Sequence, residues 1–248
     1  LFIYLPLTSF FFYYHPRDKG KAPYGLDAHT PTEANSGIGG DLTERTLPEV
    51  LRCPQVWLLV LSYALCWGVA HYMILAHQVR FLQDVGFSSM YSSFILGLFG
   101  ILVCLGQATG FLSDWIGREK AITLATISSL IGITALLCIQ DTSRPWLLYI
   151  FSMCCGYGAG LAVPTTFAAS ADIFHGRQFG TVGGLLLAGM GVGSIMGPWF
   201  GGFLHDLWGS YTIAFILCMT SLIASCLLVG VAAPRRVSHD ALARPRFP

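Results

Sequence analysis

Apolar residues along this chain of 248 residues gather into six long stretches instead of alternating with polar ones. Each stretch has at least 20 residues and contains no Asp, Glu, Lys or Arg. An uncharged apolar run of about 18 residues predicts a transmembrane helix. A helix is required because lipid offers the backbone no hydrogen-bond partner. The predicted spans are residues 55–79, 89–113, 121–140, 146–168, 181–204 and 212–233.

The composition supports this interpretation. Hydrophobic residues make up 54% of the chain and charged residues 11%, whereas a soluble domain carries about 25% charge. A soluble bundle is excluded because the stretches have no polar face. A disordered protein and a nucleic-acid binder are excluded by the same lack of charge. The eight cysteines show no Cys-x-x-Cys spacing, so no metal site is predicted.

Lys and Arg are unevenly divided between the two sides of the membrane. If the spans alternate in direction, twelve of the fourteen lie on one side, and only Arg80 and Arg144 lie on the other. Cytoplasmic loops carry the excess of Lys and Arg. We therefore expect an integral, multi-pass protein of the plasma (inner) membrane, with residues 15–54 and 234–248 in the cytoplasm.

The first residues form a shorter apolar run, 1–14, with no basic segment before it, unlike a signal peptide. As a helix it would extend about 21 Å, short of the roughly 30 Å hydrocarbon core. We expect the tail of a truncated transmembrane helix. Residues 15–54, rich in Pro, Gly, Thr and charge, predict a cytoplasmic linker with a short helix at 42–52. The six-helix domain, 55–233, and a cytoplasmic tail, 234–248, follow.

The ends of the second and fifth stretches resemble each other. Residues 110–118 read Gly-Phe-Leu-Ser-Asp-Trp-Ile-Gly-Arg, and residues 202–210 read Gly-Phe-Leu-His-Asp-Leu-Trp-Gly-Ser. Matching positions are 92 residues apart, and the first stretches of the two triplets start 91 residues apart. Three spans separate the copies, so the copies lie on opposite sides of the membrane. Inverted repeats of three helices are typical of secondary transporters.

The first copy, with Gly110, Asp114, Gly117, Arg118 and Lys120, resembles the loop signature of the major facilitator superfamily. In that family the signature lies between the second and third helices of each six-helix half, which is its position here. The resemblance implies an all-α membrane protein. Its six transmembrane helices would form two inverted three-helix repeats, half of a twelve-helix fold.

A further likeness, in residues 171–174 (Ala-Asp-Ile-Phe) and in Gly197-Pro198, is to the oxalate/formate antiporter and monocarboxylate porter branch. The resemblance implies a secondary active transporter, a symporter or antiporter, working by alternating access. This chain would be its C-terminal half, and the partner would be a missing N-terminal six-helix half. The substrate would be a small solute such as a mono- or dicarboxylate, with a coupled proton or counter-substrate. No Lys or Arg lies within the stretches, so a cation for that anion would come from the missing half, or the substrate is not a simple anion.

The loop after the second stretch is the predicted gate. Asp114 follows the expected end of a helix, where the helix dipole disfavours a negative charge, so Arg118 one turn later is a candidate partner. The resemblance implies that Asp114 acts as a latch, with Gly110 and Gly117 allowing close approach and a tight turn and Lys120 completing the motif. The alternative is a solvated ion pair worth about 0–1 kcal/mol.

Glycines recur every fourth residue in the fifth stretch, at Gly189, Gly193, Gly197 and Gly201. They share one helix face, and such small residues let helix backbones approach closely. Pro198 predicts a kink beside them, and we assign this row to helix packing and hinge bending. A nucleotide-binding loop is disfavoured because no Gly-x-Gly-x-x-Gly follows a strand.

Aromatic and polar residues in the middle of the spans are the candidate cavity residues, because such groups in a membrane usually face the protein interior. His71 is the only deep group whose usual pKa lies near neutral, so it is also the candidate for a coupled proton. For each of them the alternative role is helix packing. In the family, the cavity is lined by the helices that correspond here to the first, second, fourth and fifth spans. The candidates are Tyr63, Trp67, His71, Tyr72, Gln107 and Tyr157.

Two other classes of protein are possible but less favoured. An intramembrane enzyme would need a base and nucleophile or a metal cluster. The stretches hold no carboxylate, and His71 and His77 do not share a helix face. A channel or a non-transporting receptor lacks support because no filter-like loop or ring of charge is visible. No cofactor and no nucleic-acid partner are predicted. The predicted partners are the lipid bilayer and a small-molecule substrate.

Overall fold

The computed structural model describes residues 47–174 and 178–232. The predictions for residues 1–14, most of the linker 15–54 and the tail 234–248 lie outside these described residues. Within them, six helices are long and apolar enough to cross a membrane. These six helices are Pro54–Val85, Ser89–Ala108, Arg118–Leu137, Trp146–Ile173, Phe179–Trp208 and Thr212–Ala232.

The first and fourth spans each contain a π-helical segment, in which the turns are wider than in an α-helix. The first span consists of α3 (Pro54–Tyr63), the π segment η2 (Ala64–His71) and α4 (Tyr72–Val85). The fourth consists of α8 (Trp146–Phe151), the π segment η3 (Ser152–Gly156) and α9 (Tyr157–Ile173). The other described helices are α2 (Leu47–Arg52), α5 (Ser89–Ala108), α6 (Leu112–Ile116), α7 (Arg118–Leu137), α10 (Phe179–Trp208) and α11 (Thr212–Ala232).

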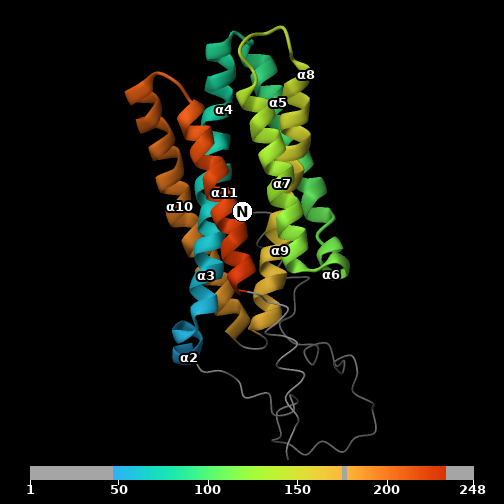
Figure 1. Cartoon of the computed structure of the whole chain (residues 1–248), viewed down its shortest axis with the longest axis vertical. Coiled ribbons are helices and arrows are strands. Elements are labelled where there is room, and N and C mark those ends of the chain that lie inside the picture. Colours follow the sequence, from blue (N-terminus) through green and yellow to red (C-terminus); the bar gives the residue numbers. More distant parts are fainter. Residues whose placement is uncertain (1–46, 175–177, 233–248) are drawn as a thin grey trace, which may run out of the picture. The chain divides into compact units, whose positions relative to one another are not determined.

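The two triplets of helices exchange their second members. The helix α5, second in its triplet, packs along η3 and α9 of the other triplet, and α10 packs along α3 and η2 of the first. The third members, α7 and α11, pack against each other, and Figure 1 shows α7 beside α9 and α11 beside α3. This exchange is the arrangement that two inverted three-helix repeats produce.

Glycines form both exchange contacts. A Cβ atom on Gly68 of η2 would lie 2.8 Å from Cα of Gly193 in α10. A Cβ atom on Gly160 of α9 would lie 2.9 Å from Cα of Gly106 in α5. Real Cβ contacts are not that short, so only glycine allows the backbones to meet there. Gly68 and Gly160 are 92 residues apart, which is the repeat spacing.

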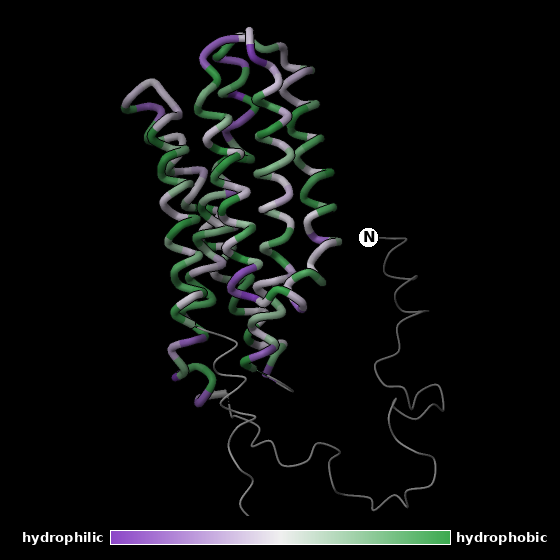
Figure 2. Tube along the Cα trace, turned by 45° about the vertical axis from the view of Figure 1, so that its right-hand side comes forward, coloured by the Kyte–Doolittle hydropathy of each residue, from purple (hydrophilic) through white to green (hydrophobic). Residues whose placement is uncertain are grey.

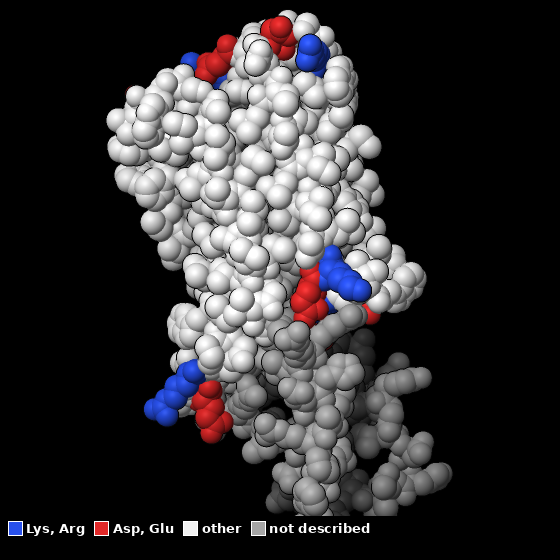
Figure 3. Space-filling view, in the orientation of Figure 1, with Lys and Arg blue, Asp and Glu red and all other residues white. Residues whose placement is uncertain are grey.

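Charge and hydropathy divide the bundle along its length. Figure 2 shows hydrophobic residues over the lengths of the helices and hydrophilic ones mainly toward their ends. On the face drawn in Figure 3, the charged side chains lie at the two ends and the band between them has none. The apolar band is the part of the surface that lipid can cover.

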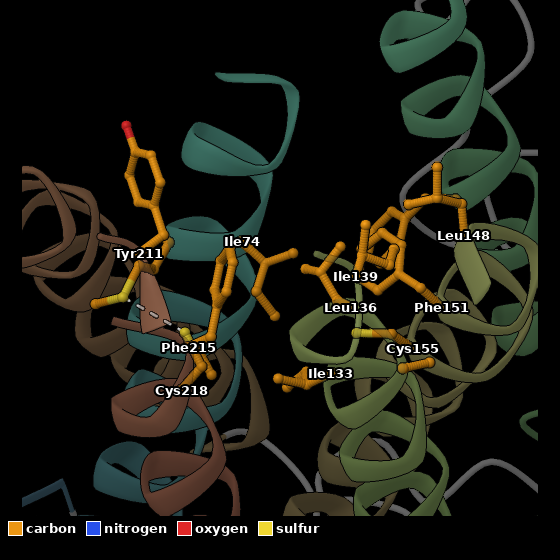
Figure 4. Packing of buried hydrophobic residues seen from close by; sticks show 14 of the residues in the cluster. Ile74, Ile133, Leu136, Ile139, Leu148, Phe151, Cys155, Tyr211, Phe215 and Cys218 are labelled. Atoms are coloured by element: carbon orange, nitrogen blue, oxygen red, sulfur yellow. Dashed lines mark hydrogen bonds between the residues drawn. The ribbon is translucent and has the colours of Figure 1, made fainter. Parts of the chain in front are cut away.

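The main core lies in the halves of the helices nearer the α4–α5 turn. Figure 4 shows Ile74, Phe215 and Cys218 facing Ile133 and Leu136 across the centre of this cluster. The Cys218 thiol donates to Met73 Sδ at 3.4 Å. This core joins α4 and α11 to α7 and α8, so the two repeats share one interior.

Candidate functional site

The π segment in the first span contains two of the candidate cavity residues, Trp67 and His71, and Tyr63 directly precedes it. Tyr63, at the end of α3, is 3% exposed and meets Phe167 of α9 edge-on at 5.7 Å between ring centroids. Trp67 lies in the middle of η2, and its indole Nε1–H donates to the carbonyl of Ala159 at 3.0 Å. Both side chains therefore contact α9 and help to pack the first span against the fourth.

Trp67 and Ala159 stand 92 residues apart, so they are equivalent positions of the two repeats. A contact between equivalent positions marks the place where the pseudo-two-fold axis passes through the bundle. Tyr72 meets the Trp67 ring edge-on at 6.1 Å and is half-buried. The structure thus brings Trp67 and Tyr72 together at the centre of the bundle.

His71 points into the interior of the six-helix bundle. It is fully buried, and its Nδ1 lies 2.7 Å from the carbonyl oxygen of Cys66. A carbonyl only accepts, so Nδ1 carries a proton and a neutral ring has its lone pair on Nε2. The polar atom beside Nε2 is Ser129 Oγ of α7 at 3.5 Å. His71 therefore faces α7, whereas Tyr63 and Trp67 contact α9.

The remaining two cavity candidates lie at the boundary between α5 and α9. The Tyr157 hydroxyl lies 3.1 Å from Oγ1 of Thr109, which also donates to the Gly106 carbonyl at 2.9 Å. Gln107, on the next position of α5, is exposed. A hydroxyl pair and an exposed amide thus adjoin each other where α5 ends.

The predicted gate contains a helix break that the apolar pattern does not show. The expected span runs to residue 113, but α5 ends at Ala108. At Gly110 a Cβ atom would lie 2.5 Å from Cγ of Pro164, so the chain turns where it presses on α9. It then forms the short helix α6, which ends at Gly117 with φ of 100°.

This break changes the electrostatic position of Asp114. The carboxylate lies in the first turn of α6, where the helix dipole favours a negative charge, and not after a helix end as expected. Asp114 Oδ1 contacts Arg118 Nη1 at 2.5 Å. Lys120, the last residue of the motif, is exposed.

Arg118 connects three segments of the chain. Its Nε donates to Asp172 Oδ2 of α9 at 2.8 Å, and its Nη1 donates to Ser113 Oγ at 2.6 Å. Only 13% of the Arg118 side chain is exposed, against 58% for Asp114 and 32% for Asp172. The less exposed pair is therefore the one that joins α7 to α9.

The glycine row of α10 faces the first span along its whole length. A Cβ on Gly189 would meet Val60, one on Gly197 would meet Val69, and one on Gly201 would meet the ring of His77. His77 Nε2 donates to the carbonyl of Pro198 at 2.9 Å. Pro198 lies within the continuous helix α10, as Pro164 lies within α9.

Three polar residues take part in these sites although the sequence did not predict them there: Thr109, Ser129 and Asp172. Asp172 lies 54 residues from Arg118, so no local spacing links them. The available signal was that Asp172 is a charged residue directly after a long uncharged stretch. Ser129 and Thr109 gave no signal, because hydroxyls often bond their own helix backbone.

Comparison with known proteins identifies the family. The profile of the Major Facilitator Superfamily matches residues 1–169 and 110–248, which together cover the chain. The chain belongs to the major facilitator superfamily. Its six helices form two inverted three-helix repeats, half of the twelve-helix fold of that family. As a superfamily member it is an integral, multi-pass membrane protein and not an enzyme.

The individual proteins to which the chain is similar share between 16% and 31% of its residues over the matched regions. The chain is 26% identical over 188 residues to monocarboxylate transporter 13 of Rattus norvegicus, covering 70% of this chain and 44% of that protein. It is 31% identical over 151 residues to a triacylglyceride transporter of Mycobacteroides abscessus, covering 60% and 27% respectively. The structure of tetrameric PepTSo2 has a TM-score of 0.62 at 16% identity and covers 77% of this chain and 44% of that one. The chain thus spans less than half the length of each of these proteins.

Proposed function

We propose that this chain is the C-terminal half of a secondary carrier that moves a small solute by alternating access. The observation that carries the proposal is the unequal burial of the six helices. The best apolar windows of α5 and α10 are each 22% buried, less than those of α7 (44%) and α11 (39%). The surface left open on α5 and α10 is where a second six-helix half would pack, and the relatives are long enough to contain one.

The substrate would bind on the face made by the first, second, fourth and fifth spans. The hydrogen-bonding groups proposed to reach it are Tyr72, Gln107 and Tyr157, with Trp67 behind them at the helix crossing. None of the six predicted spans contains Lys or Arg. We therefore assign the charge-balancing group of a mono- or dicarboxylate substrate to the other half. The relatives named monocarboxylate transporters support that substrate class.

In this proposal the α6 end is cytoplasmic and the Asp114–Arg118–Asp172 cluster holds it closed in one of the two carrier states. The excess of Lys and Arg on that side supports the orientation. His71 has no described carboxylate beside it, so a coupled proton, if there is one, is assigned to the other half. A channel would use the same helices without a closing cluster.

Counterflow in proteoliposomes tests the proposal. The complete carrier, preloaded with unlabelled monocarboxylate, should accumulate labelled substrate transiently, because only alternating access exchanges solutes. Asp114→Asn should lower the exchange rate about tenfold while membrane insertion stays normal. Flux without counterflow would show a channel. Transport by the 248-residue chain alone would show that no second half is needed.

A further inference from the structure

A small polar cavity lies inside the six-helix bundle, away from the face proposed for the substrate. It is lined by residues of the first, third, fourth and sixth spans, whereas the substrate face is made by the first, second, fourth and fifth. Its polar lining consists of Ser62, His71, Thr126, Ser129, Thr166 and Ser225. The space is about that of one water molecule, the smallest volume that a buried water occupies.

Several of the lining hydroxyls already have partners. Ser62 and Ser225 bond each other at 2.9 Å, and Thr166 donates to the carbonyl of Ala162 at 2.8 Å. Thr126 also lines the cavity and is 9% exposed. Its hydroxyl is not among the fully enclosed polar atoms that have no partner, so we infer that it borders the space of the cavity, where a water can bind it.

His71 presents a second polar group to the cavity, and its ring nitrogen Nε2 has only a long contact. Its Nδ1–H is used by the Cys66 carbonyl, so Nε2 can only accept in the neutral ring. The distance from Nε2 to Ser129 Oγ is 3.5 Å, which is longer than the 2.7–3.2 Å of an ordinary hydrogen bond. A polar contact at such a distance is often bridged by water.

We propose that this cavity binds a single water molecule, which donates to His71 Nε2 and accepts from the hydroxyls of Ser129 and Thr126. The bound water holds His71 in its neutral, Nδ1-protonated form and links η2 to α7 inside one half of the carrier. Three partners are the usual number for a buried water. The proposal does not depend on the substrate or on the second half.

The direct test is a structure of the intact protein in lipid nanodiscs at a resolution that shows ordered water. We expect one density peak within about 3.2 Å of both His71 Nε2 and Ser129 Oγ. An empty cavity, or a Ser129 hydroxyl bonded directly to Nε2, would overturn the proposal. Nitrogen NMR of His71 provides a second measurement on the unaltered protein: Nε2 should show magnetisation transfer from water protons, and its absence counts against the site.

Variants give an independent test. Thr126→Val keeps the side-chain volume but removes the hydroxyl, so it should abolish the water signal at His71 and lower the Tm by about 2–4 °C. The matched control is Thr134→Val on the same helix, because the exposed Thr134 hydroxyl bonds only its own helix at Leu130. The control should change neither quantity. An unchanged water signal in Thr126→Val would remove Thr126 from the site.

Discussion

The two repeats carry the same Gly-Phe-Leu-x-Asp pattern, but the structure folds it in two ways. In the first repeat α5 ends at Ala108, the chain turns against Pro164, and α6 follows. In the second repeat α10 continues through the pattern as far as Trp208 and ends at Gly209, which has φ of 64°. The same residues thus give a broken helix in one copy and a continuous helix in the other.

The surroundings of the pattern explain the difference. A Cβ on Gly110 would collide with Pro164, whereas one on Gly202 would meet only a ring atom of His77 at 3.8 Å. Arg118 binds Asp114 and Asp172 in the first copy. In the second copy Asp206 is 85% exposed, and position 210 is a serine. The comparison indicates that long-range contacts, more than the local pattern, determine whether this helix breaks.

The largest expected effect concerns the glycine crossings that the repeats share. Gly160→Val would drive a side chain into the α5 backbone, and Gly68→Val would do the same at α10. Overpacking of this kind without room to adjust costs about 3 kcal/mol or more. We expect both variants to lose the folded, monodisperse protein on size-exclusion chromatography in detergent.

Gly191→Val is the control for both, since nothing lies within 4 Å of a Cβ at Gly191. It should elute as the unaltered protein does. If only one crossing variant lost its folded peak, the two crossings would not be equivalent, and the structural symmetry of the repeats would fail at their centre.

A smaller effect is expected at the gate, where the repeats differ. Arg118→Gln removes both ion pairs and leaves the 32% exposed Asp172 without its partner. A hydrogen bond to a charged group contributes about 1.5–3 kcal/mol when buried and less where solvent reaches it. We expect a loss of roughly 1–2 kcal/mol in the stability of the state that the cluster is proposed to hold closed. The rate at which a thiol reagent labels a cysteine introduced at the α6 end should rise about tenfold.

Arg80→Gln is the matched control, because Arg80 pairs with Asp84 at 3.1 Å on the opposite end but is 68% exposed. Exposed pairs of this kind contribute about 0–1 kcal/mol. Equal effects of the two variants would mean that the gate cluster is no more than a surface ion pair, which is the alternative that the sequence left open.

The sequence predicted the six helices and the repeat because both depend on local pattern. Uncharged stretches mark the spans, and charges mark their ends, whichever neighbours the helices have. The π segments could not be predicted in this way. In η2 the carbonyl of Cys66 bonds the imidazole of His71, and the helix meets α10 at Gly68, so its wider turn comes with contacts to other residues.

The sequence could name the candidate residues of the site, but not most of the partners that the structure gives them. Trp67, His71 and Tyr157 were found from their depth in the spans, yet they point to three different surroundings: the α9 backbone, the α7 hydroxyls and the end of α5. The phase of a regular α-helix places Trp67 and His71 on one face. The π segment lies between Tyr63 and Tyr72, and the Trp67 and His71 rings are still only 5.3 Å apart, as the periodicity predicts. The periodicity does not predict their partners on α9 and α7.

A still smaller effect is expected at the crossing itself. Trp67→Phe removes the hydrogen bond to Ala159 and keeps most of the aromatic packing. The loss of one such bond costs about 1 kcal/mol, which corresponds to a Tm decrease of about 2–4 °C in a protein of this size. Trp57→Phe is the control, since its indole donates to Leu51 from a side chain that is 52% exposed. If the Tm decreased as much for Trp57→Phe as for Trp67→Phe, the Trp67–Ala159 hydrogen bond would stabilise the bundle no more than an exposed one does.

The smallest effect has the opposite sign and again compares equivalent positions. Gln78 and Ser170 are 92 residues apart, and both are fully buried. Ser170 donates to the Phe167 carbonyl at 2.7 Å, but neither polar atom of the Gln78 amide has a partner among the described residues. Replacing a buried, unsatisfied polar group by an apolar one of similar size removes its desolvation cost. Gln78→Met should therefore raise the Tm by about 1–3 °C, while Ser170→Ala should lower it slightly. A lower Tm for Gln78→Met would show that the amide does have a partner in the membrane-embedded protein.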